Sequence, residues 1–263
     1  MPSLDLMAHV AIQTLRISVP TIIDATLGKI STQVCNERLN LWSRQLVQGA
    51  AIRMQVSGRD HLVTGEGYIV MSNHQSHYDI PVLFQALPIP LRMVAKKELF
   101  RIPFMSGAMR AAGFIKLDRQ DRRRAIGTLV SAHTRLPDGM SIWIAPEGTR
   151  SRTGQVGPFR RGGFRMALES GMRILPVTID GTRHTLPAGQ LTVSRGHQAR
   201  VTIGRPIDPA AYGERRVNEL IAAVRGAIEQ HLPTTYIVAQ TSLRERSNER
   251  NTGACGIGFP SQE

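Results

Sequence analysis

Cysteine is scarce in this sequence, and the two cysteines that it has lie far apart. Cys35 and Cys255 stand near opposite ends of the 263 residues, so they do not form the closely spaced pairs that hold zinc. A small secreted domain stabilised by disulfides needs more cysteines than this. The pattern favours unpaired thiols in a reducing compartment.

Aromatic and acidic residues are also few. The chain has seven Phe, four Tyr and two Trp, and they do not alternate with basic residues as on surfaces that stack nucleic-acid bases. Against 33 Lys and Arg stand only 20 Asp and Glu, giving a formal charge of +13 and a pI of about 11.0. This excess favours an anionic partner. We expect anionic lipid or a phosphorylated small molecule, and no nucleic acid.

Long hydrophobic runs are missing as well. No stretch reaches the roughly 18 to 20 uncharged apolar residues that span a bilayer, and the opening Met-Pro-Ser-Leu-Asp lacks the basic segment of a signal peptide. We therefore expect no full transmembrane span and no signal peptide. The expected location is the cytoplasmic face of a membrane, with peripheral attachment.

Residues 1–56 predict a helical segment. Their apolar residues recur at helical spacing in two sets, and Pro20 and Gly28 are expected to break the segment into two helices. Arg16, Lys29 and further arginines add positive charge along it. Such a segment can lie in a membrane interface near anionic headgroups. It can equally pack on the core as a lid, and both interpretations stay open.

Residues 57–236 predict an α/β domain, with a mixed, largely parallel sheet flanked by helices. The expected strands are 68–71, 91–94, 113–117, 141–144, 174–179 and 200–203. The expected helices are 80–87, 102–112, 122–135, 162–170 and about 214–230. Residues 237–263 have little apolar content, and we predict a disordered tail there.

The run from Ser72 to Asp79 joins an expected strand to an expected helix, where open α/β sheets place their chemistry. Histidine moves protons near neutral pH, and a carboxylate can fix its tautomer and stabilise its cation. On one regular helix His74 and Asp79 would point about 140° apart, so a tight turn must bring them together. Asn73 and Ser76 are suitable turn formers. We predict a catalytic pair of His74 and Asp79, supported by Asn73 and Ser76.

Other interpretations of this run stay open. It also fits a capping loop, with Asp79 as an ordinary acid in the first helical turn. His77 competes with His74, although on a helix it would face another side. A metal site from these three side chains lacks an evident fourth ligand. A hydrolase using Ser72 or Ser76 lacks the Gly-x-Ser-x-Gly elbow, and we expect neither a metal nor a cofactor.

A second loop presents an acid, a hydroxyl and a guanidinium directly after the expected strand 141–144. Arg150 stays charged and binds phosphate through two parallel hydrogen bonds. Glu147 can accept a hydrogen bond from a substrate hydroxyl, or pair with Arg150. Thr149 supplies the hydroxyl, and Gly148 lets the backbone approach a ligand. The simpler alternative is a glycine turn with a surface ion pair.

A third loop adds Arg119 after strand 113–117, at the same sheet edge as His74 and Arg150 if the strands are parallel. Three such loops together are harder to dismiss than any one of them. Their joint pattern is a proton-transfer pair beside a phosphate clamp. It predicts transfer of a group to a hydroxyl on a phosphorylated acceptor.

Four motif blocks in this order resemble the glycerolipid acyltransferases, most closely the 1-acyl-glycerol-3-phosphate (lysophosphatidate) acyltransferase type. The blocks are Asn73-His74-x4-Asp79, which contains the HX4D motif, Gly113 to Arg119, Pro146 to Ser151, and Leu175-Pro176-Val177. The resemblance covers about residues 55–210; its first and third blocks are specific, and the others are weak alone. Lys116-Leu117 and Ala145 depart from the usual pattern, and neither departure removes a reactive group.

The resemblance implies an enzyme of phospholipid biosynthesis at an anionic membrane surface. It would move an acyl group from acyl-CoA or acyl-carrier protein to the sn-2 hydroxyl of lysophosphatidate, giving phosphatidate. His74 would be the general base, Asp79 would orient it, and backbone N–H groups near the His74 loop would hold the oxyanion. The acceptor would be bound by Arg119, Glu147, Gly148, Thr149 and Arg150. Another lysolipid acceptor, or a His/Asp-dependent hydrolase, is the alternative.

Overall fold

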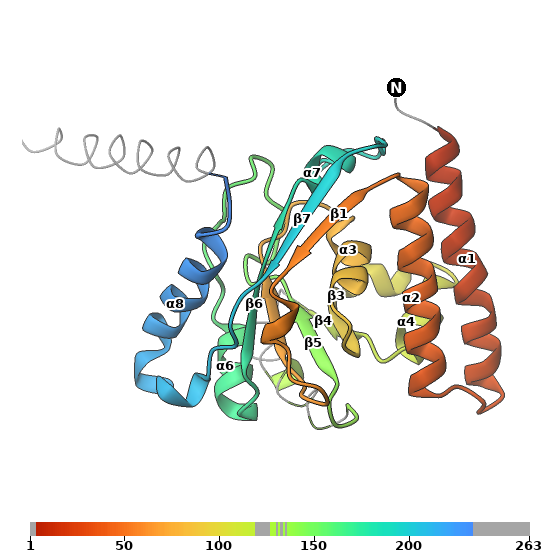
Figure 1. Cartoon of the computed structure of the whole chain (residues 1–263). Coiled ribbons are helices and arrows are strands. Elements are labelled where there is room, and N and C mark those ends of the chain that lie inside the picture. The colour runs from red at the N-terminus through yellow and green to blue at the C-terminus, as the bar shows by residue number, and fades with distance from the viewer. Residues whose placement is uncertain (1–3, 119–126, 130, 132–133, 135, 234–263) are drawn as a thin grey trace, which may run out of the picture.

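The computed structural model describes residues 4–118, 127–129, 131, 134 and 136–233. In this part the chain forms a seven-stranded sheet of order β1-β7-β6-β2-β5-β3-β4 (Figure 1). The strands are β1 (Arg53–Ser57), β2 (Ile69–Ser72), β3 (Leu91–Lys96), β4 (Ile115–Leu117), β5 (Ser141–Ile144), β6 (Ile174–Asp180) and β7 (Gln198–Ile203). The β6–β7 pair is antiparallel and the other neighbours are parallel. The predicted fold class is confirmed.

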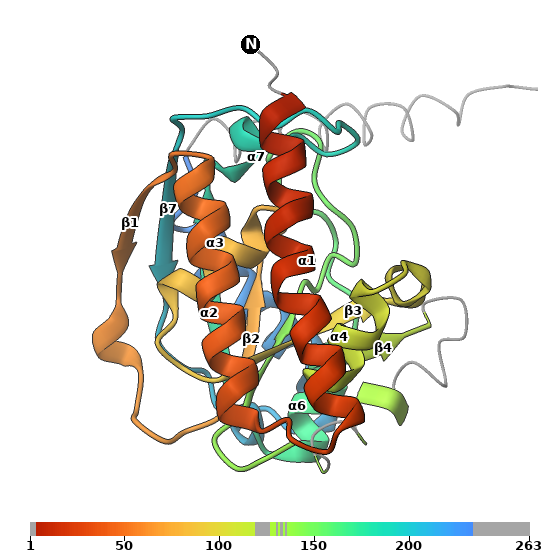
Figure 2. The ribbon, with the colours of Figure 1, turned by 90° about the vertical axis from the view of Figure 1, so that its right-hand side faces the viewer.

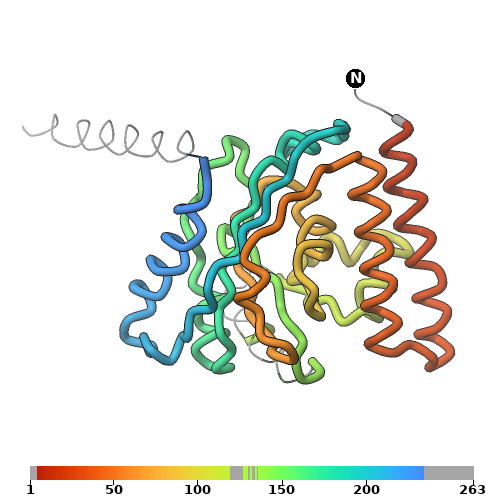
Figure 3. Tube along the Cα trace, viewed as in Figure 1, coloured from red at the N-terminus to blue at the C-terminus, as the bar shows by residue number. Residues whose placement is uncertain are grey.

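Helices cover both faces of the sheet, with red and orange helices on one side and the blue helix on the other (Figure 3). On the first side lie α1 (Leu4–Thr26), α2 (Thr32–Gly49), α3 (Asp79–Ala86) and α4 (Met105–Ala111). On the second lie α6 (Gly162–Ser170) and α8 (Val217–Glu229). The short helical turns are η1 (Arg59–His61), η2 (Lys97–Arg101), α7 (Thr182–Thr185), η3 (Pro209–Ala211) and η4 (Glu214–Arg216).

Each face of the sheet buries its own set of side chains. Val70 of β2 packs in the cluster that includes side chains of α2 and α3. Its neighbours Ile69 and Met71 pack in the cluster of α6 and α8. Successive side chains of a strand point to opposite faces, so a continuous apolar run such as β2 serves both cores.

Three adjacent strands set the position of the functional loops. β5, β2 and β6 are parallel neighbours, so their carboxyl ends meet at one edge of the sheet. The His74 loop follows β2, the 145–151 loop follows β5, and α7 follows β6. The His74 loop therefore lies between the other two segments.

The N-terminal helices form a hairpin on the outside of one face (Figure 2). α1 contacts α2 and α4, and it turns the polar side chains of Ser18 and Thr21 inward, where they are buried. Arg38 of α2 donates to the Thr21 hydroxyl at 3.2 Å. Large apolar side chains of α1 are instead exposed, namely Met7, Ile12, Leu15, Val19 and Ile23. Much of the apolar surface of α1 therefore faces outward.

α1 corrects the expectation that no hydrophobic run is long enough to span a membrane. The stretch Asp5–Thr26 has 22 residues, and within it an 18-residue window has a mean hydropathy of 1.4 and is 17% buried. Among the described helices it alone is long and apolar enough to cross a bilayer. Arg16 interrupts the run, so the sequence has no uncharged stretch of that length. Core helices and N-terminal signal sequences meet the same criterion. The length and composition of α1 therefore show an apolar helix, and they do not show that it lies in a membrane.

Two local predictions in the N-terminal part are wrong. Pro20 lies inside α1 and does not end it. The proline removes one backbone donor, and contacts with α2 and α4 support the helix. The break comes at Gly28, where φ is +68°. Residues 53–57 are not helical but form the edge strand β1, parallel to β7. The alternation of polar and apolar residues over 53–57 was the signal available in the sequence.

The other predicted strands and helices that the structure describes lie within a few residues of their predicted bounds, and 141–144 and 162–170 agree at both ends. The short turns η1, η2, α7 and η3 were not predicted. The predicted tail and most of the predicted helix 122–135 lie outside the described residues. The division of the chain at residues 56 and 236 stays a prediction. Leu39, Leu46 and Val47 of α2 pack in the same core cluster as the sheet and α3.

Candidate active site

His74 and Asp79 meet at the carboxyl end of β2. His74 follows the strand in a turn, and Asp79 is the first residue of α3. Nδ1 of His74 lies 2.7 Å from Oδ2 of Asp79. Because an ionised carboxylate only accepts, Nδ1 carries the proton, and Nε2 is left as the ring nitrogen that can take one. The predicted meeting of the two side chains is confirmed, whereas their catalytic roles stay predictions.

The carboxylate of Asp79 is fully buried and is held by donors from two segments. Besides His74, the backbone N–H groups of Gln75 and Ser76 donate to Oδ2 at 2.7 and 3.0 Å. The hydroxyl of Thr182 donates to Oδ1. A buried carboxylate needs such donors in place of water. Thr182 was missing from the predicted site, because nothing in the local sequence links it to residue 79.

Asn73 and Ser76 fix the turn that carries His74, as expected. The buried amide of Asn73 donates to the Ile179 carbonyl at 2.7 Å and accepts from the Ile179 N–H at 2.8 Å. It thereby continues the β2–β6 pairing beyond the end of β2. The Ser76 hydroxyl donates to the Leu186 carbonyl at 2.8 Å. Asn73 thus ties the turn to β6 itself, and Ser76 ties it to the segment that follows β6.

Trp143 of β5 borders the His74 ring. The two rings meet edge to face, with centroids 5.4 Å apart and an interplanar angle of 85°. The indole N–H of Trp143 donates to the Ser72 hydroxyl at 2.9 Å, which fixes the indole. This wall limits the positions open to the His74 ring.

Glu147 holds the backbone of His74. Its Oε1 accepts the His74 N–H at 2.9 Å, and its Oε2 accepts the Gly157 N–H at 2.8 Å. The Ser151 N–H donates to the His74 carbonyl at 2.7 Å, so the 145–151 loop grips both sides of this residue. Desolvation raises the pKa of Glu147, and the two backbone hydrogen bonds oppose that rise. Both oxygens face the backbone, which differs from the two partners expected for Glu147, a substrate hydroxyl or Arg150.

The rest of this loop lies beside the histidine. Arg150 is partly buried, and its Nη1 is buried without a hydrogen-bond partner among the described residues. Gly148 has a φ of +73°, a left-handed conformation that strains a residue with a side chain. A Cβ there would also displace the side chain of Arg160. Thr149 is exposed. Arg119, the remaining predicted ligand, lies outside the described residues.

His77, the competing histidine, is less suited to take a proton near neutral pH. The pKa of His77 is lowered to about 4, first by desolvation and then by the charges of Arg150 and His74. Its ring has no carboxylate within hydrogen-bond distance in the described part of the chain, unlike the ring of His74. Over the same residues, no group of three or more His, Cys, Asp or Glu side chains is placed to hold a metal ion.

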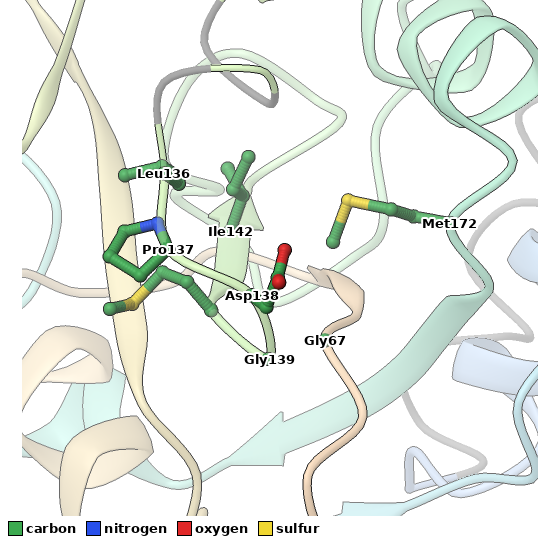
Figure 4. A pocket seen from close by; sticks show the side chains of 8 residues that line it. Gly67, Leu136, Pro137, Asp138, Gly139, Ile142 and Met172 are labelled. Atoms are coloured by element: carbon green, nitrogen blue, oxygen red, sulfur yellow. The ribbon is translucent and has the colours of Figure 1, made fainter.

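A small cavity of about 190 Å³ lies elsewhere, close to the starts of β2 and β5 (Figure 4). Its lining includes Gly67, Ile142 and Met172, with Asp138 as the charged member. Since the starts of these parallel strands form the sheet edge opposite to His74, this cavity is separate from the histidine site.

The site can therefore do two things chemically. Nε2 of His74 can take a proton from a hydroxyl group, with Asp79 stabilising the resulting cation. The adjacent Arg150 can bind an anionic group. A histidine–carboxylate pair beside an arginine loop, at the carboxyl edge of a mostly parallel sheet, is suited to proton transfer on an anionic substrate.

Comparison with known proteins agrees with this class of site. An acyltransferase family model matches residues 53–180. The chain is 30% identical over 200 residues to the 1-acyl-sn-glycerol-3-phosphate acyltransferase of Borreliella burgdorferi, covering 76% of this chain and 77% of that relative. It is 34% identical over 167 residues to the enzyme of that name from Escherichia coli K12, covering 62% and 66%. The chain belongs to the acyltransferase family.

Other comparisons extend and limit this result. A 1-acyl-sn-glycerol-3-phosphate acyltransferase of Chlamydomonas reinhardtii is 28% identical over 192 residues, 73% of this chain and 56% of that relative. The chain thus spans little more than half of one relative and just under two thirds of the Escherichia coli one. The crystal structure of the 1-acyl-sn-glycerophosphate acyltransferase PlsC from Thermotoga maritima has a TM-score of 0.66 at 24% identity, covering 85% and 98% of the chains. It shares the fold.

The raised pKa of Glu147 predicts a pH-dependent loss of stability. The pKa of this carboxyl is higher in the folded than in the unfolded chain. Its contribution to the free energy of unfolding is therefore largest at a pH below the unfolded-state pKa, and it is lost as pH rises through the folded-state pKa. Urea unfolding from about pH 4 to about pH 8 should therefore show wild type losing stability relative to Glu147→Gln as pH rises.

The matched control is Glu169→Gln, which changes an exposed carboxyl on α6. The difference in free energy of unfolding between this variant and wild type should vary less with pH. The free energy of unfolding of wild type minus that of Glu147→Gln should fall as pH rises. A difference that stays constant or grows would contradict the raised pKa of Glu147.

Proposed function

We propose that this protein transfers a fatty acyl group from acyl-CoA or acyl-carrier protein to the sn-2 hydroxyl of 1-acyl-glycerol-3-phosphate, giving phosphatidate. The observation that carries the proposal is the 2.7 Å hydrogen bond from His74 to the buried Asp79, beside the arginine loop. Relatives named for this reaction support it. The donor brings an activated thioester, so the reaction needs no further cofactor.

Proton removal is the first task of the site. Nε2 of His74 takes the proton of the acceptor hydroxyl while the oxygen attacks the thioester carbonyl carbon. Asp79 stabilises the imidazolium through Nδ1. When the tetrahedral intermediate collapses, the carbon–sulfur bond breaks and the leaving thiolate takes the proton from Nε2. The ring returns to its starting state, and no acyl-enzyme forms.

The oxyanion of the intermediate needs hydrogen-bond donors. The N–H groups of His74, Gln75 and Ser76 already donate to Glu147 and Asp79. These three N–H groups of the loop are therefore not the donors. The N–H of His77 has no acceptor within the described residues, and it is the donor that we assign to the oxyanion.

The acceptor phosphate binds at the loop that follows β5. Arg150 has a buried, unpartnered Nη1 there, and a guanidinium in that state favours an anionic ligand. The family resemblance adds Arg119 as a second ligand, with Gly148 and Thr149 shaping the loop. Glu147 has a different task, since both of its oxygens already accept backbone N–H groups: it holds His74 in place.

A membrane surface is the place of reaction, because the acceptor is a lipid. The outward apolar side chains of α1, among them Ile12, Leu15 and Ile23, suit the hydrocarbon side of an interface. The formal charge of +13 suits anionic headgroups on the cytoplasmic face. We place the protein there as a peripheral enzyme held by α1.

His74→Ala should abolish most turnover. The purified protein is incubated with lysophosphatidate and a long-chain acyl-CoA, or acyl-carrier protein, while free thiol and phosphatidate are measured together. Loss of a general base predicts a fall in kcat of about 10²–10⁴-fold, and His231→Ala, at the end of α8, is the control. Full activity of His74→Ala would contradict the mechanism. Thiol release without phosphatidate would indicate a hydrolase or another acceptor.

Arg150→Ala should mainly raise the KM for lysophosphatidate, since it removes a phosphate ligand. Loss of one charge-assisted hydrogen-bonded contact predicts a rise of about tenfold or more, with the KM for the acyl donor changing less. Arg205→Ala removes an exposed arginine after β7, at the other edge of the sheet. Equal effects of the two substitutions on acceptor KM would argue against the phosphate role.

Binding to vesicles should be sensitive to salt. Each well-placed Lys or Arg near an anionic surface contributes about 1 kcal/mol, and salt screens this attraction. Sedimentation with vesicles of anionic phospholipid should show binding that weakens with added salt, and weaker binding to neutral vesicles at low salt. Binding that is independent of both salt and lipid charge would contradict the electrostatic part of the proposal.

A further inference from the structure

We infer that Thr182 is a further positioning residue of the catalytic pair: its hydroxyl orients the Asp79 carboxylate, which in turn orients His74. The inference rests on the proposed function, in which His74 is the general base. Thr182 is distant from the histidine motif in sequence. It reaches the motif because β6 is the neighbour of β2 in the sheet.

The two oxygens of Asp79 have unequal partners. Oδ2 accepts three hydrogen bonds, from the ring of His74 and from the N–H groups of Gln75 and Ser76. Oδ1 accepts the hydroxyl of Thr182 and has no other donor in the described chain. The terminal torsion of a carboxylate is soft. Thr182 is therefore the contact that resists rotation from the Oδ1 side and keeps Oδ2 aimed at Nδ1.

Thr182 is itself held firmly. It is fully buried, so no water competes for its hydroxyl. Gly181 before it has a φ of +93°, and a Cβ there would lie 2.1 Å from the carbonyl oxygen of Gln198, which makes the turn out of β6 tight. At the other end of α7, the Leu186 carbonyl accepts the Ser76 hydroxyl. α7 is thus tied to the catalytic turn at both ends.

The chain offers a matched control within the same short helix. Thr185 is also buried, at 1% exposure, but its Oγ1 has no hydrogen-bond partner among the described residues. Thr182→Val and Thr185→Val replace the same hydroxyl by a methyl group in the same element. Only the first removes a hydrogen bond to Asp79.

The kinetic test compares Thr182→Val, Thr182→Ser and Thr185→Val with wild type. Loss of a hydrogen bond to a buried charged group predicts a fall in kcat of about tenfold or more for Thr182→Val. Both KM values should change by less than about twofold, because Thr182 is not a substrate ligand. Thr182→Ser should restore kcat, and Thr185→Val should keep it.

Three kinetic outcomes would overturn the inference. Unchanged kcat in Thr182→Val shows that the hydroxyl is not needed. Equal losses in Thr182→Val and Thr185→Val show a packing effect, and a loss that serine does not restore shows that the hydroxyl is not the cause. Thermal unfolding of each variant identifies a variant that has simply failed to fold. If Thr182→Val fails to fold, Thr182→Ala, which removes the same hydroxyl, takes its place in the comparison with Thr182→Ser and Thr185→Val.

A measurement without substrate separates this inference from the proposed function. The Nδ1 proton of His74, hydrogen-bonded to Asp79, should give a low-field proton NMR resonance in the free protein, assigned by its loss in His74→Ala. The resonance should shift or broaden in Thr182→Val and stay in place in Thr185→Val. If wild type fails to make phosphatidate but this pattern appears, the proposed substrate is wrong and the positioning role stands. An unchanged resonance in Thr182→Val would overturn the positioning role.

Discussion

The buried carboxylate of Asp79 is the constraint on which the rest of the site depends. An anion removed from water costs several kcal/mol unless donors replace its hydration, so its surroundings cannot be arranged freely. The N–H groups of Gln75 and Ser76 must turn inward, and the His74 ring must present Nδ1. Thr182, which follows the end of β6, must place its hydroxyl against Oδ1 of Asp79. The turn between β2 and α3 takes its shape from these requirements, and Nε2 of His74 is left to act on a substrate.

The sheet makes this arrangement possible by placing β5, β2 and β6 side by side. Glu147 reaches the His74 backbone from the loop after β5. Asn73 joins the turn to β6, and Ser76 joins it to the segment after β6. The catalytic turn is therefore braced from both neighbours. Glu147, which the sequence motif suggested as a substrate ligand, is better explained as a residue that holds this turn in place, because both of its oxygens accept backbone N–H groups. Arg150 remains as the charged group of that loop with an unsatisfied donor.

Much of this could be predicted from local sequence, and the rest could not for identifiable reasons. Residues 141–144 and 162–170 have strong local patterns, and the structure gives them the expected bounds. The meeting of His74 and Asp79 follows from turn geometry and was also predicted. Thr182 depends on which strands are neighbours, a property of the whole sheet. Residues 53–56 were assigned to the helices before them, although polar and apolar residues alternate there in the sequence as in a strand. The apolar character of α1 is not evident as an uncharged run, because Arg16 interrupts it. The mean hydropathy nevertheless stays high enough for a helix that could span a membrane.

The most direct test of this account is the tautomer of His74 in the free protein, measured by ¹⁵N NMR with labelled histidine and assigned with His74→Ala. Because Asp79 accepts from Nδ1, the neutral ring should carry its proton on Nδ1 and show a bare Nε2. Asp79→Asn should disturb that preference. A ring protonated on Nε2 in the neutral wild-type protein would contradict the account, since the nitrogen assigned as the base would already hold its proton.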